Sequence, residues 1–441
     1  MTPLIIDSLY WGIPFLGLLL SIAIFPLVNA TFWHEHFGKI TIAWTLLFAI
    51  PFTYQFGFAT SFHEIFHILL LDYLPFTIIL TALYTISGGI RLQGNFMPTP
   101  AVNTLFLTFG TVIASWIGTT GAAMLLIRPL IATNEHRQHK THIIIFFVFL
   151  VANIGGSLTP LGDPPLFLGF LNGIPFFWPT EHMFLPMLFV SIILLVAFWF
   201  LDSYYYRLED PSVKIKPPHL TQKLQVQGLQ NLLLLLMVIF VVLLSGIDYL
   251  IETLGRASLF GVEFNAVRIV SGLCMIALTL ISLKWTEKEI RVANHFNWFP
   301  MQEVAKLFFG IFITIIPVIA YLKTNTAMMD PLFTMFPKEA TYFWLTGILS
   351  AFLDNAPTYL VFFNAAGGAE TLLANPTTLL AISAGAVFMG ALTLIGNAPN
   401  FLVFSVAKER KVKMPSFLGY MLWSVPILFP PFILVTWIWF L

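Results

Sequence analysis

Long apolar runs recur in this sequence from residue 12 to its C-terminal end, and no other feature restricts its fold as strongly. Most runs are close to the roughly 20 residues that a helix needs to cross the hydrocarbon core of a bilayer. Of 441 residues, 58% are hydrophobic and only 10% are charged, whereas soluble domains contain about 25% charged residues. The pattern predicts an all-α integral membrane protein whose main partner is the lipid bilayer.

The apolar pattern predicts ten full crossings and two shorter excursions into the membrane. The crossings are residues 12–30, 40–58, 72–90, 143–173, 183–201, 231–250, 266–283, 307–322, 376–407 and 417–440. The stretches 101–133 and 340–366 are each too long for one crossing and are interrupted at Gly118-Thr119-Thr120-Gly121 and Asp354-Asn355-Ala356-Pro357. We predict re-entrant helical hairpins whose tips face a shared polar site, because non-helical backbone at membrane depth needs polar surroundings.

Basic residues indicate the orientation, because loops rich in Lys and Arg stay cytoplasmic. With ten crossings and two hairpins, five basic loops fall on one side. They centre on Arg91, Lys140, Lys216, Lys288 and Arg410. This arrangement predicts a multi-pass protein of the cytoplasmic (inner) membrane with both termini outside.

Charge and cysteine content exclude several classes of partner and cofactor. The 21 basic residues balance the 21 acidic ones, so the chain has no electrostatic footprint for nucleic acid. Its single cysteine, Cys274, rules out an intrachain disulfide and a multi-thiolate metal site. We expect no cofactor other than transported ions.

The sequence repeats itself at a shift of 234 positions. This shift places Gly156, Thr159, Gly162 and Asp163 on Gly390, Thr393, Gly396 and Asn397, and Thr120 on Asp354. Residues 1–201 would form the first repeat, with hairpin 101–133 and broken helix 143–173. After a plain cytoplasmic linker at 202–230, residues 231–441 would form the second, with hairpin 340–366 and broken helix 376–407. The two broken helices cross in opposite directions, and inverted repeats with interrupted helices are typical of secondary transporters.

Two carboxylates fall inside the interrupted segments. Asp163 follows a Gly- and Pro-rich break, and Asp354 lies at a hairpin tip. Asp163 before Pro164 also fits a helix cap, but a carboxylate at bilayer depth is costly and by default functional. We therefore favour a functional role for both.

The interrupted segments supply hydroxyl, amide, carboxylate and free carbonyl oxygens. Such hard ligands suit a small hard cation. The candidate residues are Thr119, Thr120, Thr159, Asp163, Asp354, Asn355, Thr393 and Asn397. We place sodium at Asp163, Asp354, Asn355 and Asn397, and the two carboxylates would exchange it for protons.

An anion site is the competing interpretation. The half-helices after Asp163 and Asn397 begin with free N–H groups and positive partial charge, which would suit a carboxylate substrate. However, Asp163 occupies one of these ends, and neither broken segment contains Arg or Lys. The nearest basic residue, Arg128, is expected to extend to the cytoplasmic interface.

Several short segments resemble the ion transporter superfamily. The run Leu349-Ser350-Ala351-Phe352-Leu353-Asp354-Asn355-Ala356-Pro357 looks like a segment of NhaD-type sodium/proton antiporters, and so does the run from Asn153 to Asp163. Gly162-Asp163-Pro164-Pro165 looks more like the arsenite-efflux and P-protein branch. Sequences of this type also resemble citrate transporters, although the Ser-Asn-Thr signatures of the dicarboxylate branch are absent. The resemblance adds Asn153 to the candidate site and implies elevator-type movement, often in a homodimer.

We therefore predict a secondary active sodium/proton antiporter, with sodium or lithium as the ion. A citrate, dicarboxylate or other anion transporter is the alternative. A remote alternative is an intramembrane zinc metalloprotease, because His63-Glu64-Ile65-Phe66-His67 fits the H-E-x-x-H pattern. No third zinc ligand has a recognisable motif around it, so we do not expect an enzyme.

Overall fold

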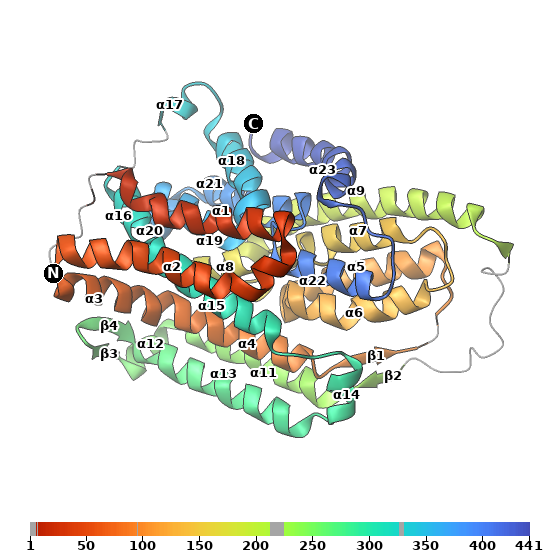
Figure 1. Ribbon diagram of the computed structural model, residues 1–441, viewed down its shortest axis with the longest axis horizontal. Coiled ribbons are helices and arrows are strands. Elements are labelled where there is room, and N and C mark those ends of the chain that lie inside the picture. The colour runs from red at the N-terminus through yellow and green to blue at the C-terminus, as the bar shows by residue number, and fades with distance from the viewer. Residues whose placement is uncertain (1–5, 7, 95, 212–224, 326–329) are drawn as a thin grey trace.

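The computed structural model is almost entirely helical (Figure 1). It describes residues 6, 8–94, 96–211, 225–325 and 330–441. The predicted basic loop around Lys216 lies outside the described residues.

The first half of the chain contains the elements up to α9. They are η1 (Leu9–Gly12), α1 (Ile13–Val28), α2 (Ala30–Phe56), α3 (Phe58–Ile68), a π-helical turn η2 (Leu69–Tyr73), α4 (Leu74–Ser87), β1 (Arg91–Gln93), α5 (Pro100–Ile117), α6 (Thr119–Thr133), α7 (Thr141–Leu150), η3 (Ile154–Ser157), α8 (Pro164–Leu171) and α9 (Trp178–Leu208).

The second half begins at β2. Its elements are β2 (Gln225–Gln227), α11 (Leu229–Ser245), α12 (Asp248–Leu254), β3 (Arg256–Leu259), β4 (Val262–Asn265), α13 (Ala266–Trp285), α14 (Lys288–Ala293), α15 (Phe299–Thr314), α16 (Ile316–Thr324), α17 (Asp330–Phe333), α18 (Lys338–Leu353), α19 (Asn355–Ala365), α20 (Gly368–Ala374), α21 (Pro376–Met389), η5 (Gly390–Leu392), α22 (Ala398–Glu409) and α23 (Phe417–Trp439). The strands form two antiparallel pairs, with Arg91 opposite Gln227 in one and Arg256 opposite Asn265 in the other.

Eight helices among the described residues are long and apolar enough to cross a membrane. Seven of them correspond to predicted crossings, and the eighth is α5, one arm of the first predicted hairpin. A pair of helices, Gly368–Ala374 and Pro376–Leu392, is bent by 114° and would make a ninth span if counted as one. The membrane protein is thus confirmed, while the count of ten crossings stays a prediction.

Both hairpin interruptions fall where the sequence predicts them. Helix α5 ends at Ile117 and α6 begins at Thr119, with Gly118 between them at φ 80°. In the second hairpin α18 ends at Leu353 and α19 begins at Asn355, with Asp354 between them at φ 76°. In each hairpin the two arms pack against each other. The breaks are 236 positions apart (354 minus 118), two more than the shift that superposes the broken helices.

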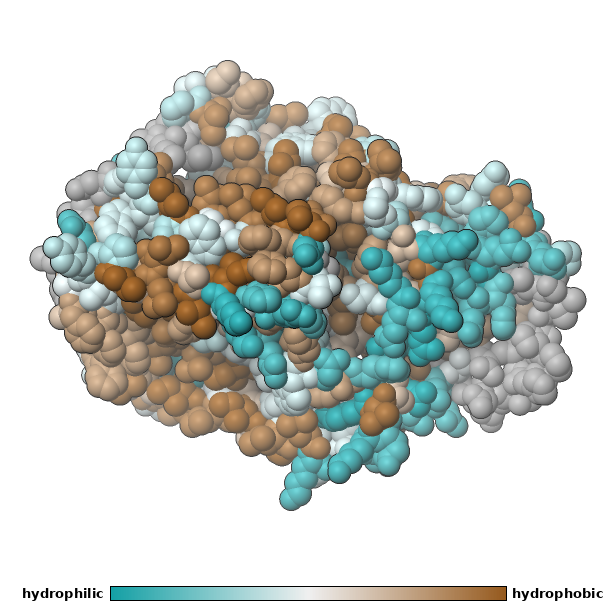
Figure 2. Space-filling model, viewed as in Figure 1, coloured by the Kyte–Doolittle hydropathy of each residue, from teal (hydrophilic) through white to brown (hydrophobic). Residues whose placement is uncertain are grey.

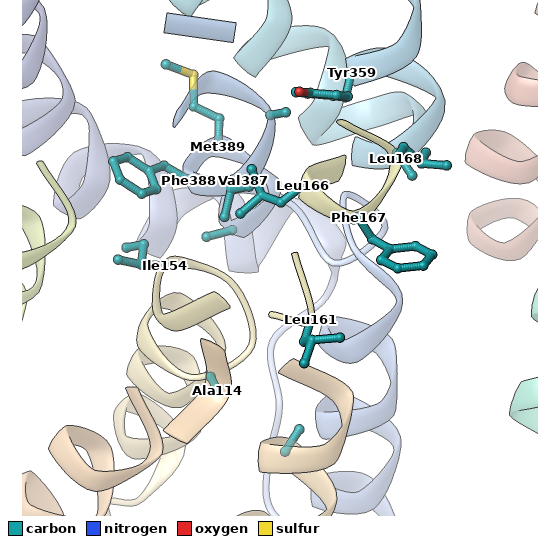
Figure 3. Close-up of a cluster of buried hydrophobic side chains, with 14 of the residues drawn as sticks. Ala114, Ile154, Leu161, Leu166, Phe167, Leu168, Tyr359, Val387, Phe388 and Met389 are labelled. Atoms are coloured by element: carbon teal, nitrogen blue, oxygen red, sulfur yellow. The ribbon is translucent and has the colours of Figure 1, made fainter. Parts of the chain in front are cut away.

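Both predicted broken helices are interrupted. In the first, residues 158–163 separate η3 from α8, and in the second, residues 393–397 separate η5 from α22. The glycines in these breaks allow two stretches of backbone to meet. A Cβ atom on Gly162 would overlap the carbonyl of Gly156, and one on Gly396 would overlap that of Gly390. Around the first break lies a buried apolar cluster that includes Ile154, Leu161, Leu166, Tyr359 and Met389 (Figure 3).

Among the described residues, the predicted basic loops around Arg91, Lys140, Lys288 and Arg410 lie at one end of the molecule. Strand β1 pairs with β2, and the Asn294 side chain after α14 donates to the carbonyls of Gly88 and Ile90. Thr141 donates to the carbonyl of Lys413 over 2.8 Å. Figure 2 shows hydrophilic residues gathered on this side and apolar surface over α1, α2 and α3. We call this the basic end.

A buried ionic cluster ties four elements together at the basic end. Arg137 lies 2.6 Å from Asp202, which also contacts His142 at 2.8 Å and accepts a 2.9 Å hydrogen bond from Asn103. Arg137 also lies 3.8 Å from Glu209, whose carboxylate accepts from the backbone N–H groups of Gln138 and His139. Helix α9 therefore continues to Leu208, beyond the predicted linker boundary at residue 202.

Candidate functional site

Asp163 is the centre of the polar region between the interrupted helices. It is 1% exposed. Its Oδ1 atom accepts from the Thr119 hydroxyl at 3.2 Å and from the Asn397 amide at 2.9 Å, and its Oδ2 atom accepts from the Asn355 amide. These donors come from α6, from the break before α22 and from α19. One carboxylate therefore joins both hairpins and both broken helices.

A second layer of amides supports this centre. Asn397 donates to Asn153 Oδ1 at 3.3 Å, and Asn153 donates to Asn400 at 2.7 Å. Asn400 donates in turn to the carbonyls of Gly390 and Thr393. Asn400 was not among the predicted residues. Its signal in the sequence is a second asparagine within the apolar segment that contains Asn397.

Asp354 lies at the tip of the second hairpin and is half-buried. Its carboxylate accepts from the backbone N–H of Ala356 at 3.2 Å and so caps α19. It lines the same small cavity as Thr119, Thr120, Asp163 and Asn397, which has a volume of about 90 Å³. The Oδ1 atom of Asn355 is buried near this point without a hydrogen-bond partner.

Thr159 and Thr393 hold each broken helix to its hairpin. The Thr159 hydroxyl donates to the carbonyl of Ser115, and the Thr393 hydroxyl donates to the carbonyl of Ala351. Each hydroxyl also accepts a backbone N–H at 3.2 Å. Because both hydroxyls are engaged in this way, the geometry assigns them to positioning the site.

Helices α6 and α22 begin at this site without an acidic cap. Gly118 precedes α6 and Asn397 precedes α22, and neither helix has a side-chain cap bond at its N-terminus. The other two helices that begin here, α8 and α19, follow Asp163 and Asp354. Asp354 caps α19, whereas Asp163 makes no cap bond to α8. Each half of the chain thus supplies one carboxylate and one helix N-terminus that no carboxylate precedes.

A larger cavity of about 500 Å³ leads from the site to the basic end. Asp354 and Asn397 line its inner part, and His295 and Glu409, whose side chains are 50% and 47% exposed, lie at its mouth. Arg128 also lines it, with a side chain only 15% exposed. Its neighbour Glu409 lies at the mouth, so Arg128 is close to the basic end, and its expected extension to the cytoplasmic interface stays a prediction.

At the opposite end lies a hydrogen-bonded group that we call the clasp and define as Arg268, Asp72, Asn172 and the carbonyls they bind. Arg268 also lines a separate cavity of about 970 Å³ at this end. Arg268 donates to the carbonyl of Leu71 at 3.3 Å and to that of Leu171 at 2.7 Å. The Asn172 amide donates to Asp72 at 3.2 Å. These bonds join the end of α8 to the η2 turn and α13.

The sequence segment 63–67 forms part of α3. The rings of His63 and His67 lie 6.2 Å apart, and His63 contacts Glu64 at 3.5 Å. Within the part of the chain that the structure describes, no group of three or more His, Cys, Asp or Glu side chains could hold a metal ion.

A family model described as "Putative citrate transport" matches residues 6–440. The chain belongs to this family. The citrate-transport family is part of the ion transporter superfamily, so the broader resemblance in the sequence is confirmed. Membership indicates a transporter and not an enzyme. No curated protein matches the chain.

Membership of the citrate-transport family favours the anion alternative over the sodium/proton antiporter that we predicted first. The sequence argument against an anion relied on the absence of basic residues near the breaks. It included the N-terminus of the half-helix after Asn397, which is α22, but not the N-terminus of α6 or the place of Arg128 in the cavity wall, because these two depend on how distant segments pack.

Proposed function

We propose that this protein is a secondary active transporter that moves a citrate-type carboxylate together with small cations. The carboxylate occupies the 500 Å³ cavity, and the cation occupies the 90 Å³ cavity beside Asp163 and Asp354. The two cavities share walls at Asp354, Asn397 and Ala398.

The observation that carries this proposal is the difference in size between the two adjoining cavities. Ligand pockets for small molecules are usually about 300 to 1,000 Å³, which includes the larger cavity. The smaller one has room for about three waters or a partly hydrated ion. A six-carbon tricarboxylate therefore fits only the larger cavity.

Charge also supports coupling to cations. No Lys or Arg side chain among the described residues lines the small cavity, although it contains two carboxylates. A citrate-type anion would bring further negative charge to the same region, which like-charge repulsion opposes. Sodium ions or protons at Asp163, Asp354, Asn355 and Asn397 would neutralise the site, while the N-termini of α6 and α22 would face the anion.

We include in this proposal the elevator-type transport cycle that the sequence predicts. The two halves act as inverted repeats, and the hairpins and broken helices move as a unit against the remaining helices in an elevator-type cycle. The homodimer that the resemblance implies also belongs to this proposal.

Uptake of radiolabelled citrate into proteoliposomes tests the proposal. We expect citrate to accumulate when an inward gradient of sodium or protons is applied, with lithium, potassium and magnesium as comparisons. Asp163→Asn and Asp354→Asn should each lower cation-driven uptake at least tenfold, a change of about 1.4 kcal/mol. Glu370→Gln, which alters an exposed carboxylate on α20, should have no effect.

The same vesicles distinguish the proposed carboxylate transporter from a sodium/proton antiporter. If sodium collapses a preset pH gradient in the absence of any carboxylate, and citrate does not move, the sodium/proton antiporter is correct and the proposed function is wrong.

A further inference from the structure

The large cavity contains a cationic side chain that the proposed site does not use. Arg128 lies on α6, nine residues after Thr119, which places it about 14 Å along the helix axis from the N-terminus of α6. Arg128 does not line the small cavity around Asp163, and its neighbour Glu409 lies at the mouth of the large cavity. Any anion that contacts Arg128 is therefore at a separate position on the route to the basic end.

The Arg128 guanidinium has a hydrogen-bond donor without an acceptor. Its Nη1 atom is buried and has no hydrogen-bond partner, and its nearest acidic neighbour, Glu409, is 3.8 Å away. That distance permits ionic attraction but is beyond a hydrogen bond. Glu409 is 47% exposed and also pairs with His295 at 3.4 Å. An ion pair that is half exposed and separated by this distance contributes little free energy, so Glu409 binds Arg128 only weakly.

The rest of the cavity wall near Arg128 can accommodate a polar anion. Tyr84, Asn294, Asn297 and Ser405 line the cavity together with His34 and His295. Guanidinium groups bind carboxylates through two parallel hydrogen bonds, and this geometry favours Arg for carboxylate recognition.

We propose that Arg128 forms a second anion subsite in the cavity, which binds one carboxylate of the substrate between the basic end and the central site. Glu409 competes with the substrate for Arg128 and leaves it when a carboxylate binds. This inference depends on the proposed function, because it requires that the transported species carries a carboxylate.

The test measures citrate transport from the cavity side in vesicles of uniform orientation. Arg128→Gln should raise the KM for citrate at least tenfold, whereas Glu409→Gln should lower it about threefold, because the competing carboxylate is gone. The sodium or proton concentration that gives half-maximal transport should change less than twofold in both variants. Arg128→Lys keeps the charge without the paired donors and should give an intermediate KM.

Arg410→Gln is the matched control, because it removes one positive charge at the same end from an exposed residue outside the cavity lining. If Arg410→Gln raises the KM as much as Arg128→Gln, general electrostatic attraction explains the effect and the subsite is wrong. If Arg128→Gln and Glu409→Gln change the KM in the same direction, Arg128 is only the structural partner of Glu409.

The two proposals fail in different ways. Wild-type protein that moves no carboxylate contradicts the proposed function and with it the subsite. Wild-type protein that moves citrate, combined with an unchanged KM in a monodisperse Arg128→Gln variant, contradicts the subsite alone.

Discussion

At the scale of single residues, the backbone of Asp354 is costly. Its φ of 76° and ψ of 141° nearly equal the 80° and 148° of Gly118 at the tip of the first hairpin. This region of conformational space is almost restricted to glycine, and another residue there costs about 1 to 3 kcal/mol. An aspartate at this position therefore indicates that its carboxylate is needed.

Two substitutions at Asp354 separate the effect of its backbone conformation on stability from the effect of its carboxylate on transport. Asp354→Gly and Asp354→Ala both remove the cap of α19, but only alanine keeps the strained conformation. We expect Asp354→Gly to be more stable than Asp354→Ala by about 1 to 2 kcal/mol, while both lose cation-driven transport. Thermal unfolding in detergent measures the difference, and Gly118→Ala should lose stability by a similar amount. Equal stability of the glycine and alanine variants would show that the hairpin tip relaxes.

The candidate residues differ in how far the sequence could identify them. The sequence singled out Asp163 and Asp354 because a charge within an interrupted apolar segment is rare, and the structure brings both to the small cavity. The positions of Thr159 and Thr393 could not be deduced, since their partners are carbonyls on hairpins more than 40 residues away in sequence. The place of Arg128 in the wall of the large cavity could not be deduced, because its neighbour Glu409 is 281 residues away in sequence (409 minus 128).

At the scale of elements, the ionic cluster at the basic end fixes how α5, α7 and α9 meet. Arg137, Asp202 and Glu209 have fully buried side chains. A buried charge that loses its partner is destabilising by about 3 to 5 kcal/mol, whereas replacing the whole pair by apolar groups costs far less.

A double-mutant cycle on this cluster tests that asymmetry. Arg137→Met and Asp202→Leu should each lower the free energy of unfolding by about 3 to 5 kcal/mol, and the double variant should lose less than the sum. Thermal unfolding in detergent measures the three variants. Additive losses would mean that the two charges are not coupled.

The cluster also makes stability depend on acidity. Burial acts to raise the pKa of Glu209, but the N–H groups of Gln138 and His139 and the charge of Arg137 outweigh it and hold that pKa below its usual 4.5. A carboxyl group with a lowered pKa contributes stability that is complete above its unfolded pKa and lost as pH falls through the folded one.

We therefore expect the melting temperature to fall as pH decreases below about 4.5. Glu209→Gln should be less stable at pH 7 and should show a smaller acid loss than the wild type. Glu289→Gln, an exposed change on α14, serves as the control and should follow the wild-type curve. If the melting temperature of Glu209→Gln falls with pH as steeply as that of the wild type, other groups cause the loss of stability in acid.

Element boundaries also show the limits of a repeat read from sequence. The shift of 234 aligns the broken helices but pairs Thr120 with Asp354, whereas the equivalent backbone positions are Gly118 and Asp354. From the hairpin break to the first glycine of the broken segment there are 38 positions in the first half (156 minus 118) and 36 in the second (390 minus 354), and the second connection also contains α20. Loops accept such changes readily, so one constant shift cannot align both parts.

At the scale of the whole molecule, the cavity that contains Asp354 and Asn397 opens at the basic end, where His295 and Glu409 are exposed. At the other end Arg268 joins α8 to the η2 turn, and the cavity there is not lined by Asp163, Asp354 or Asn397. If the basic end is cytoplasmic, as the loop charges predict, this is an inward-facing state.

Loosening the clasp should shift the protein away from that state. In a Cys274→Ser background, a cysteine at Ser405, which lines the cavity, reports access from the basic end. We expect Arg268→Ala to slow its labelling by an impermeant maleimide about fivefold, or roughly 1 kcal/mol. Arg256→Ala changes an exposed arginine on β3 and should label at the wild-type rate. An unchanged labelling rate in Arg268→Ala would mean that the clasp does not affect the equilibrium between the inward-facing state and other states.

The overall organisation was the most predictable level. The length of the apolar runs identified the membrane protein, because the bilayer sets helix length. The polar and glycine interruptions within two long runs located both hairpin breaks, because the bilayer penalises irregular backbone. The substrate class was less accessible, since it depends on cavities that form only when the two halves pack together.

The central hydrogen bonds have a consequence for how the chain is made. Asn355 and Asn397 follow Asp163 by 192 and 234 residues. At about 5 to 20 residues per second, synthesis of the intervening chain takes roughly 10 to 50 s. Throughout that interval the newly inserted first half holds Asp163 without two of its three donors. The nascent protein must therefore keep this carboxylate protonated, hydrated or shielded by the insertion machinery until translation is complete.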